Sequence, residues 1–517
     1  MSTSLVVLEV SQKQAFIFSS NKLKKNICNS AYIAYVTSEE FFKVAAKEEF
    51  DKGNIVYTGG GHTVLEFAEE GDAKKFVSVI TECVIRNIPE MELFAKVYTV
   101  EGEPNIDSLK TLMEALEEKK SIRKATFVQG TFGVERLDVN TGRAIIVGNS
   151  KDNRLPDTEE KIDSELFPDG FTKAWNFGDL CGSDDNKNFL AVIHIDGNAM
   201  GKRVIEYRQS IAEKSWNYAK EKMNKFSENI DHDFKSAFKE MEDIIAKQIE
   251  LGYLNDLKLK KDEKGNSFFP IRRIITAGDD ICFVTNGKIG LECARIFLEK
   301  LSGKVNETDN KGYSACAGVA LVHQKYPFYK AYELAEQLCS NAKSYIATTA
   351  GTEASAFCSG IDWHVEYGEV PDTLDGLKEE YIADDGSIMT LKPYVVVKDE
   401  KFPQSEKFRD YNNFRTLISR LQNKDIDFAR GKLKQLRDAI RKGENATEVY
   451  LSANLMNDLK LVGFQNIFQE MDFTKAFENG GLEKTAYVKI GENRHSIFFD
   501  AIEIMDVFIP VDEKEET

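Results

Sequence analysis

Two runs of apolar residues, at 5–11 (LVVLEVS) and 190–196 (LAVIHID), open two similar segments of the chain. Near-continuous apolar runs of this length are typical of strands buried on both faces. Each run is followed by a helix-like stretch and then by a strand–turn–strand pattern, IVYTGGGHTVLEF at 55–67 and RIITAGDDICFV at 273–284. The pattern therefore predicts an internal duplication.

The same order of elements continues after each turn. An amphipathic helix and a further strand are expected at 72–88 and 92–100 in the first copy, and at 290–305 and 313–322 in the second. The order β-α-β-β-α-β is that of a ferredoxin-like domain. We therefore predict an α+β fold with two ferredoxin-like domains. A last amphipathic helix is expected in the second copy at 327–346.

The remaining segments divide the chain further. Long helical periodicity follows residue 200, and amphipathic helices resume beyond 350. The predicted units are a first domain at 1–104, a linker or small intervening domain at 105–185, a second domain at 186–350 with a helical insertion near 201–270, and a mostly helical C-terminal domain at 351–517.

Composition excludes several classes of function. A net charge of -17 argues against general binding of nucleic acid or of an acidic membrane surface. The eight cysteines form no CxxC pair, which argues against a zinc ribbon or a disulfide framework. With no signal peptide and no apolar run long enough to span a bilayer, a cytoplasmic protein is expected.

Three carboxylates are the candidate chemistry. Asp196 ends an apolar strand, while Asp279 and Asp280 lie on the hairpin turn of the next strand pair. In a ferredoxin-like sheet these strands are neighbours, so the carboxylates are expected to converge and to need a cation. A pair of Mg²⁺ or Mn²⁺ ions fits such oxygen ligands and would serve phosphoryl chemistry. Taken alone, Gly-Asp-Asp is also a common turn sequence.

The turn of the first copy lacks these carboxylates. Aligning the two turns places Gly60 opposite Gly278, Gly61 opposite Asp279, and His62 opposite Asp280. Aligning the opening strands by their apolar runs places Ser11 opposite Asp196. We therefore expect one copy to react and the other to keep only the shape of the site.

These motifs resemble the large polymerase-like subunit of type III CRISPR effector complexes, whose paired palm domains carry a GGDD motif and make cyclic oligoadenylate. Four stretches carry the resemblance, which covers about the first 350 residues: SQKQAFIFSSNKLKKNICNSAYIAY (11–35), YTGGGH (57–62), IDGNAMGKRV (195–204), and AGDD (277–280) with the strand and helix that follow it. Ala277 replaces the first glycine of GGDD, and Gly197 stands where the family often has a second acidic residue. The family's zinc-ribbon cysteines and its N-terminal HD nuclease domain are not found.

The resemblance implies roles for individual residues. Asp196, Asp279 and Asp280 are expected to bind the metal ions, and Gly278 to let the nucleotide approach closely. The remaining nucleotide-binding candidates are Gly197, Asn198, Lys202 and Lys343 in the second palm, with Lys343 on the triphosphate, and Ser30, Gly60 and Gly61 in the first.

The implied function is a stand-alone nucleotidyltransferase that condenses nucleoside triphosphates into a cyclic or short linear oligonucleotide messenger for antiviral defence. ATP is the default substrate, with other nucleotides and deoxynucleotides left open, and an effector protein would respond to the product. Binding to a guide RNA or a membrane is not expected. Two alternatives remain: a non-catalytic structural or nucleotide-binding subunit of a type III-like RNA-guided complex, and a cyclase acting on a single nucleotide.

Overall fold

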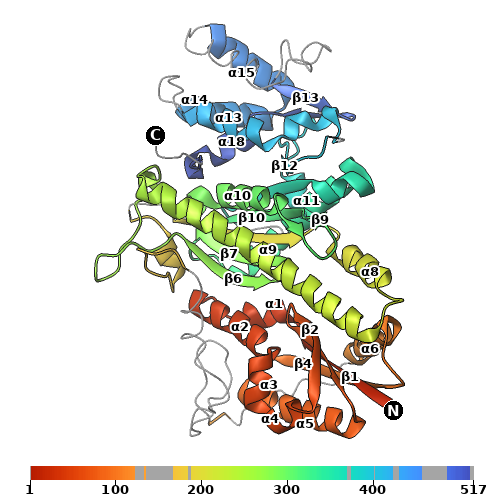
Figure 1. The fold of residues 1–517 in the computed structure, drawn as a ribbon. Coiled ribbons are helices and arrows are strands. Elements are labelled where there is room, and N and C mark those ends of the chain that lie inside the picture. The colour runs from red at the N-terminus through yellow and green to blue at the C-terminus, as the bar shows by residue number, and fades with distance from the viewer. Residues whose placement is uncertain are drawn as a thin grey trace.

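The computed structural model describes residues 2–122, 133–134, 167–183, 188–368, 374–400, 402–422, 430–456 and 486–512. Much of the predicted linker or intervening domain, at 123–132, 135–166 and 184–185, lies outside the described residues. Figure 1 shows the first palm at one end of the molecule, the second palm in the middle and the C-terminal region at the other end. In the described ranges no helix is both long and apolar enough to cross a membrane.

The first palm is a four-stranded antiparallel sheet in the order β2-β3-β1-β4. Successive residues of β1 from Leu5 to Leu8 are all fully buried, so both faces of this strand are covered, as its apolar run predicts. Two helices, α5 and α6, contact β1 and β4. The elements are β1 (Ser2–Ser11), α1 (Lys13–Ile17), α2 (Leu23–Val36), α3 (Glu39–Ala45), α4 (Lys47–Phe50), β2 (Gly53–Gly59), β3 (His62–Phe67), α5 (Glu70–Asn87), β4 (Glu92–Glu101) and α6 (Ile106–Ser121).

The second palm has a six-stranded sheet in the order β12-β11-β10-β5-β7-β6. Its part β6-β7-β5-β10 has the same order and direction as β2-β3-β1-β4, so the predicted α+β fold with a duplicated palm is confirmed. The elements are β5 (Phe189–Gly197), α8 (Met200–Ser210), α9 (Trp216–Glu250), β6 (Ile271–Ala277), β7 (Asp280–Asn286), α10 (Gly290–Ser302), β10 (Ala315–His323), α11 (Phe328–Ala354), β11 (Ser359–Val365) and β12 (Tyr394–Val397), with the short β8 (Val305–Asn306) and β9 (Lys311–Gly312).

Helix α9 packs against both palms. Its buried residues recur at helical spacing from Met223 through Phe226, Ile230 and Phe234 to Phe238, which explains why this charged segment is a continuous helix. The helix contacts α10 and β6 of the second palm and β2 of the first, and its diagonal course between them is visible in Figure 1. It therefore fixes how the two sheets lie relative to each other.

In the described residues beyond 410 the C-terminal region is mostly helical, with one short strand pair, β13 and β14. Its first two strands, however, belong to the second palm, because β11 pairs in parallel with β10 and β12 pairs with β11. The predicted division at residue 350 thus separates strands that share one sheet. The later elements are α12 (Leu374–Glu379), α13 (Tyr411–Gln422), α14 (Arg430–Arg441), α15 (Glu444–Met456), β13 (Tyr487–Ile490), β14 (Asn493–Ser496) and α18 (Phe499–Ile504).

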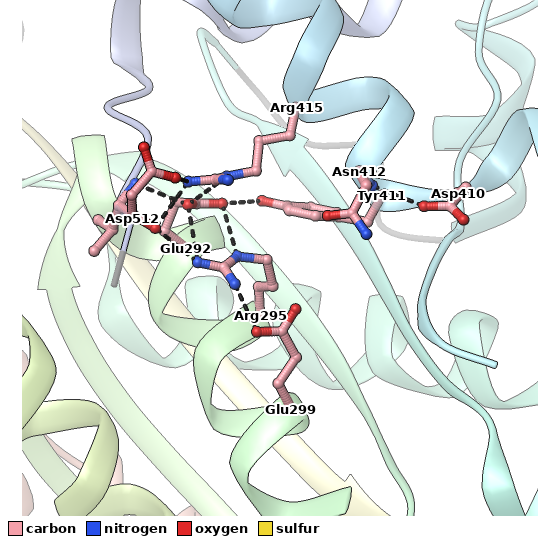
Figure 2. A network of polar contacts seen from close by, with 9 residues as sticks. Glu292, Arg295, Glu299, Asp410, Tyr411, Asn412, Arg415 and Asp512 are labelled. Atoms are coloured by element: carbon pink, nitrogen blue, oxygen red, sulfur yellow. Dashed lines mark hydrogen bonds and ion pairs between the residues drawn. The ribbon is translucent and has the colours of Figure 1, made fainter. Parts of the chain in front are cut away.

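A buried carboxylate joins this region to the second palm (Figure 2). Glu292 of α10 is fully buried and accepts hydrogen bonds from the Tyr411 hydroxyl (3.1 Å), from Arg415 Nε (2.8 Å) and from the Val511 backbone N–H (2.8 Å). Arg295 pairs with the same carboxylate at 3.2 Å. Buried charges need such complete pairing. This network therefore couples helix α13 and the segment at Val511 to the second palm.

Candidate functional site

The β6–β7 turn and the end of β5 bring the three predicted carboxylates together. Asp196 lies directly opposite Asp280 in the β5–β7 pair, and the Gly197 N–H donates to the Asp279 carbonyl at 3.3 Å. Gly278 has φ 65°, a left-handed conformation that glycine adopts without strain. A Cβ atom on Gly197 would lie 3.0 Å from Asp279 Cβ. The glycine that departs from the family pattern therefore makes room for the Asp279 side chain.

Two of the three carboxylates, Asp279 and Asp280, are held in a setting that disfavours their charges. Burial, reinforced by the charge of Asp196, raises the pKa of Asp280 to about 7 and that of Asp279 to about 6. Asp280 Oδ1 is buried without a hydrogen-bond partner, and the nearest ring nitrogen, His194 Nδ1, is 3.5 Å away. Carboxylates in this arrangement are stabilised in their ionised form by a cation.

A lysine from α11 already provides one positive charge. Lys343 Nζ donates to Asp196 Oδ2 at 2.5 Å and to the Gly197 carbonyl at 2.8 Å. The predicted triphosphate-binding lysine is thus placed directly on the first of the three carboxylates. Its ammonium side chain is about a quarter exposed, so it can also face a bound anion.

The donor set fits a hard divalent ion. Three carboxylates, one with an orphaned buried oxygen, are the ligands that Mg²⁺ and Mn²⁺ prefer. As the side chains are placed, no three His, Cys, Asp or Glu residues of the described chain form a ready-made metal-binding group. Asp196, Asp279 and Asp280 remain the residues that would hold the ion.

A cavity of about 910 Å³ opens beside the carboxylates and reaches the first palm. This volume lies near the upper end of the about 300–1,000 Å³ that pockets for small ligands measure. Helix α9 forms part of its wall. The predicted residues that line it are Ser30, Gly60 and Gly61 from the first palm and Gly278, Asp279 and Asp280 from the second.

Two predicted residues point elsewhere. Asn198 donates through Nδ2 to Ser314 Oγ (3.1 Å) and to the Cys358 carbonyl (2.9 Å), which ties the end of β5 to the neighbouring part of the sheet. Lys202 is 68% exposed on α8 and pairs with Glu206 at 3.7 Å. Neither is among the residues that line the cavity, and the lining does not include Asp196, Gly197 or Lys343 either.

The strand register corrects the predicted alignment of the two copies. Glu9 lies opposite His62 in the first palm just as Asp196 lies opposite Asp280 in the second, so Glu9, and not Ser11, is the counterpart of Asp196. Three residues further on, Gln12 and Ala199 both adopt a left-handed conformation, with φ 48° and 53°. The first palm therefore keeps one carboxylate of the site.

Sequence reasoning missed three residues around this carboxylate. Glu9 Oε1 accepts a hydrogen bond from Lys120 at 2.7 Å, and Lys13 donates to the Gly60 carbonyl of the turn. Helix α6, which carries Lys120, follows β4 as α11 with Lys343 follows β10. Glu9 is the sequence feature from which these residues could be found. Once Glu9 is aligned with Asp196, Lys120 corresponds to Lys343, and Lys13 lies four residues after Glu9 as Met200 lies four residues after Asp196.

Comparison with known proteins agrees with this architecture. Residues 189–348 match the family model for the second palm domain of Cas10/Cmr2. None of the curated proteins matches the sequence. Among solved structures, Csm1 of T. onnurineus is similar with a TM-score of 0.54 and 16% identity, over 98% of this chain and 69% of that one. A Csm1–Csm4 cassette in complex with cA3 gives a TM-score of 0.52, 16% identity and the same coverage. The predicted resemblance to the polymerase-like subunit of type III CRISPR complexes is confirmed, and at this identity the structures show the fold.

Proposed function

We propose that the chain is a nucleotidyltransferase that joins nucleoside triphosphates into a cyclic or short linear oligonucleotide. One observation carries this proposal: Asp279 and Asp280 at the β6–β7 turn, with Asp196 opposite Asp280, open into the same cavity as the glycine turn of the first palm. Two nucleotides bound at the two turns would face each other across it. Such proximity is what a condensation between two nucleotides requires.

In this proposal the second palm holds the triphosphate that is attacked. Asp196, Asp279 and Asp280 bind Mg²⁺ or Mn²⁺, which when bound would polarise the α-phosphate and stabilise the leaving pyrophosphate. Lys343 donates to Asp196 and would bind the β- and γ-phosphates. Gly278 has no side chain, so the backbone of the turn leaves room for the phosphates.

The first palm would present the 3′-hydroxyl of the second nucleotide. Ser30 and the turn residues Gly60 and Gly61 line its side of the cavity. Attack of the 3′-oxygen on the α-phosphorus of the facing triphosphate forms a phosphodiester bond and expels pyrophosphate. The hydroxyl proton leaves to solvent or to a carboxylate of the site. A second transfer between the ends of the product would close a ring.

ATP is the substrate that we propose. The similar Csm1–Csm4 structures were solved in complex with cA3, cA4 and pppApA, and those ligands support an adenine nucleotide as substrate and an oligoadenylate as product. We further propose that the product acts as a messenger in antiviral defence and is read by a separate effector protein.

The test is direct. Purified protein is incubated with each NTP and dNTP and with Mg²⁺ or Mn²⁺; pyrophosphate is measured and products are identified by mass spectrometry. We expect an oligonucleotide from wild type and none from Asp279→Ala/Asp280→Ala, whereas Asp243→Ala, a change of an exposed aspartate on α9, keeps full activity. If wild type and the double variant are equally inactive with every nucleotide, the chain is instead a binding subunit; a cyclic mononucleotide would identify the single-nucleotide cyclase.

A further inference from the structure

The first palm carries a lysine beside its turn at a position where the second palm has a methionine. Lys13 is the first residue of α1 and Met200 is the first residue of α8, and both follow the left-handed residues that align the two palms. Met200 lines the cavity with an apolar side chain, while Lys13 extends its ammonium to the Gly60 carbonyl of the turn. A cation thus replaces an uncharged residue at an equivalent position.

Glycine at position 61 makes this exchange possible. Gly61 is the counterpart of Asp279, and a Cβ atom on it would lie 3.0 Å from Lys13 Cε and 2.9 Å from Ile33 Cγ2. A side chain at this position would crowd Ile33 and Lys13, and φ of 76° would strain it as well. Gly61 therefore leaves room for the Lys13 side chain beside the turn that in the second palm carries Asp279.

The exchange inverts the charge of the site. In the second palm three carboxylates (Asp196, Asp279, Asp280) and one ammonium (Lys343) give a formal charge of -2. In the first palm one carboxylate (Glu9) and two ammonium groups (Lys13, Lys120) give +1.

His62 adds no charge to this balance, because burial lowers its pKa to about 4. Lys120 pairs with both Glu9 and the exposed Glu117, and it does not line the cavity, so Lys13 supplies the ammonium that faces the cavity.

We infer that the first palm binds the phosphates of its nucleotide through Lys13 and without a divalent ion, whereas binding in the second palm requires one. The inference rests on the proposed function for the presence of a nucleotide at each turn. Its physical basis is that an ammonium group of the protein occupies the place of the missing carboxylate and supplies the positive charge directly.

The burial of Lys13 supports this role. Loss of hydration lowers the pKa of the Lys13 ammonium against the opposing effects of Glu9 and Asp280, and a phosphate beside it would add stabilisation. Lys13 lines the cavity, so an anion can reach it. In the second palm an added anion would instead meet three carboxylates unless a metal ion lies between them.

Calorimetric titration with an ATP analogue that carries a methylene bridge between the α- and β-phosphorus atoms tests the inference. For the wild-type chain we expect about one equivalent bound in EDTA and about two in Mg²⁺. Lys13→Met, which copies Met200, should weaken binding in EDTA by about tenfold or more, because a charge-assisted hydrogen bond is lost. Lys13→Arg keeps the charge and should bind within a few-fold of wild type.

A second measurement needs no variant at position 13. Photocrosslinking of wild type with an azido-ATP in EDTA, followed by peptide mapping, should label the first palm around Ser30 and His62, and Mg²⁺ should add label in the second palm. The inference is overturned if wild type binds nothing in EDTA, if Lys13→Met binds as wild type does, or if the EDTA label lies in the second palm. Binding in EDTA without any turnover in Mg²⁺ would retain this inference and contradict the proposed transferase alone.

Discussion

Ser227 and Asp231, one turn apart on α9, hydrogen-bond to the turns of two different palms. Ser227 Oγ donates to the Thr58 carbonyl at 3.2 Å, and Asp231 Oδ1 accepts from the Gly278 N–H at 3.3 Å. The distance between the two turns is therefore set by a single rigid helical turn. In a reaction between two bound nucleotides, this distance fixes how well the attacking and attacked groups align.

Removing both contacts should slow the reaction more than it weakens nucleotide binding. Each hydrogen bond contributes about 1 kcal/mol. In Ser227→Ala/Asp231→Ala we expect kcat to fall about tenfold and KM to stay within about twofold, because each palm keeps its own binding residues. Steady-state measurement of pyrophosphate release decides this. Asp243→Ala on the same helix is the control, since its carboxylate pairs with Lys239 and touches neither turn. A rise in KM with unchanged kcat would contradict the alignment role.

Removing Lys343 should weaken binding of the triphosphate. Its ammonium links Asp196 to the Gly197 carbonyl, and without it three carboxylates face the anionic substrate. A charge-assisted hydrogen bond contributes about 1.5–3 kcal/mol, so KM for the nucleotide should rise about tenfold or more in Lys343→Ala. Higher Mg²⁺ should partly compensate, and Lys343→Arg should retain most of the affinity. Initial rates over a matrix of nucleotide and Mg²⁺ concentrations test this, and an unchanged KM would show that Lys343 is structural.

The order of helices and strands could be predicted because the spacing of apolar residues along the sequence follows the buried face of each element. The continuous apolar runs of β1 and β5 and the helical spacing of α9 follow from their covered faces, and the structure has them as expected. The sequence predicts a boundary at residue 350 that separates β11 and β12 from the second palm, because nothing local in these strands reveals that β11 pairs with β10. That pairing is set by tertiary contacts.

The alignment of the two palms failed by two residues for a physical reason. Side chains of a strand alternate with a period of two, so a shift of two keeps every apolar residue on its face. Ser11 and Glu9 therefore fit equally well opposite Asp196 by hydrophobicity, and only the backbone register separates them. With Glu9 as the counterpart of Asp196, Lys13 and Lys120 are identified as residues of the first-palm site.

Stability should depend on pH through Glu242 of α9. This carboxyl is 4% exposed, and burial raises its pKa to about 7, against the opposing effect of Arg273, with Lys239, Asp243 and Arg272 also nearby. The folded protein therefore prefers the neutral form. This preference costs nothing below the unfolded pKa near 4.5, and the folded state is destabilised as pH rises from there through 7.

Glu242→Gln should remove this pH dependence. A shift of this size corresponds to about 3 kcal/mol. The variant should match wild type near pH 4 and unfold at a higher temperature than wild type at pH 8, in thermal melts followed by circular dichroism. Glu240→Gln, on an exposed part of the same helix, should show no such pH-dependent difference. A variant less stable than wild type at pH 8 would mean that Glu242 is charged and paired in the folded protein.

The Glu292 network predicts that the C-terminal region detaches when its buried carboxylate is lost. Glu292→Ala leaves Arg295 and Arg415 close together without their shared anion and removes the acceptor of the Val511 N–H. Breaking a buried ion pair on one side costs about 3–5 kcal/mol. Loss of the Tyr411 hydrogen bond adds to this, so α13 and the chain end should separate from α10 before the palms unfold.

Limited proteolysis at increasing urea concentration measures this separation. In Glu292→Ala we expect cleavage near α13 at a lower urea concentration than in wild type, while the palm fragment stays protected. Glu292→Gln keeps the shape and one acceptor, and should show a smaller shift. Glu299→Ala is the matched control, because it removes another partner of Arg295 that is about one-third exposed and contacts the network only at its edge. Equal shifts in Glu292→Ala and Glu299→Ala would show that the buried carboxylate has no special part in holding the two regions together.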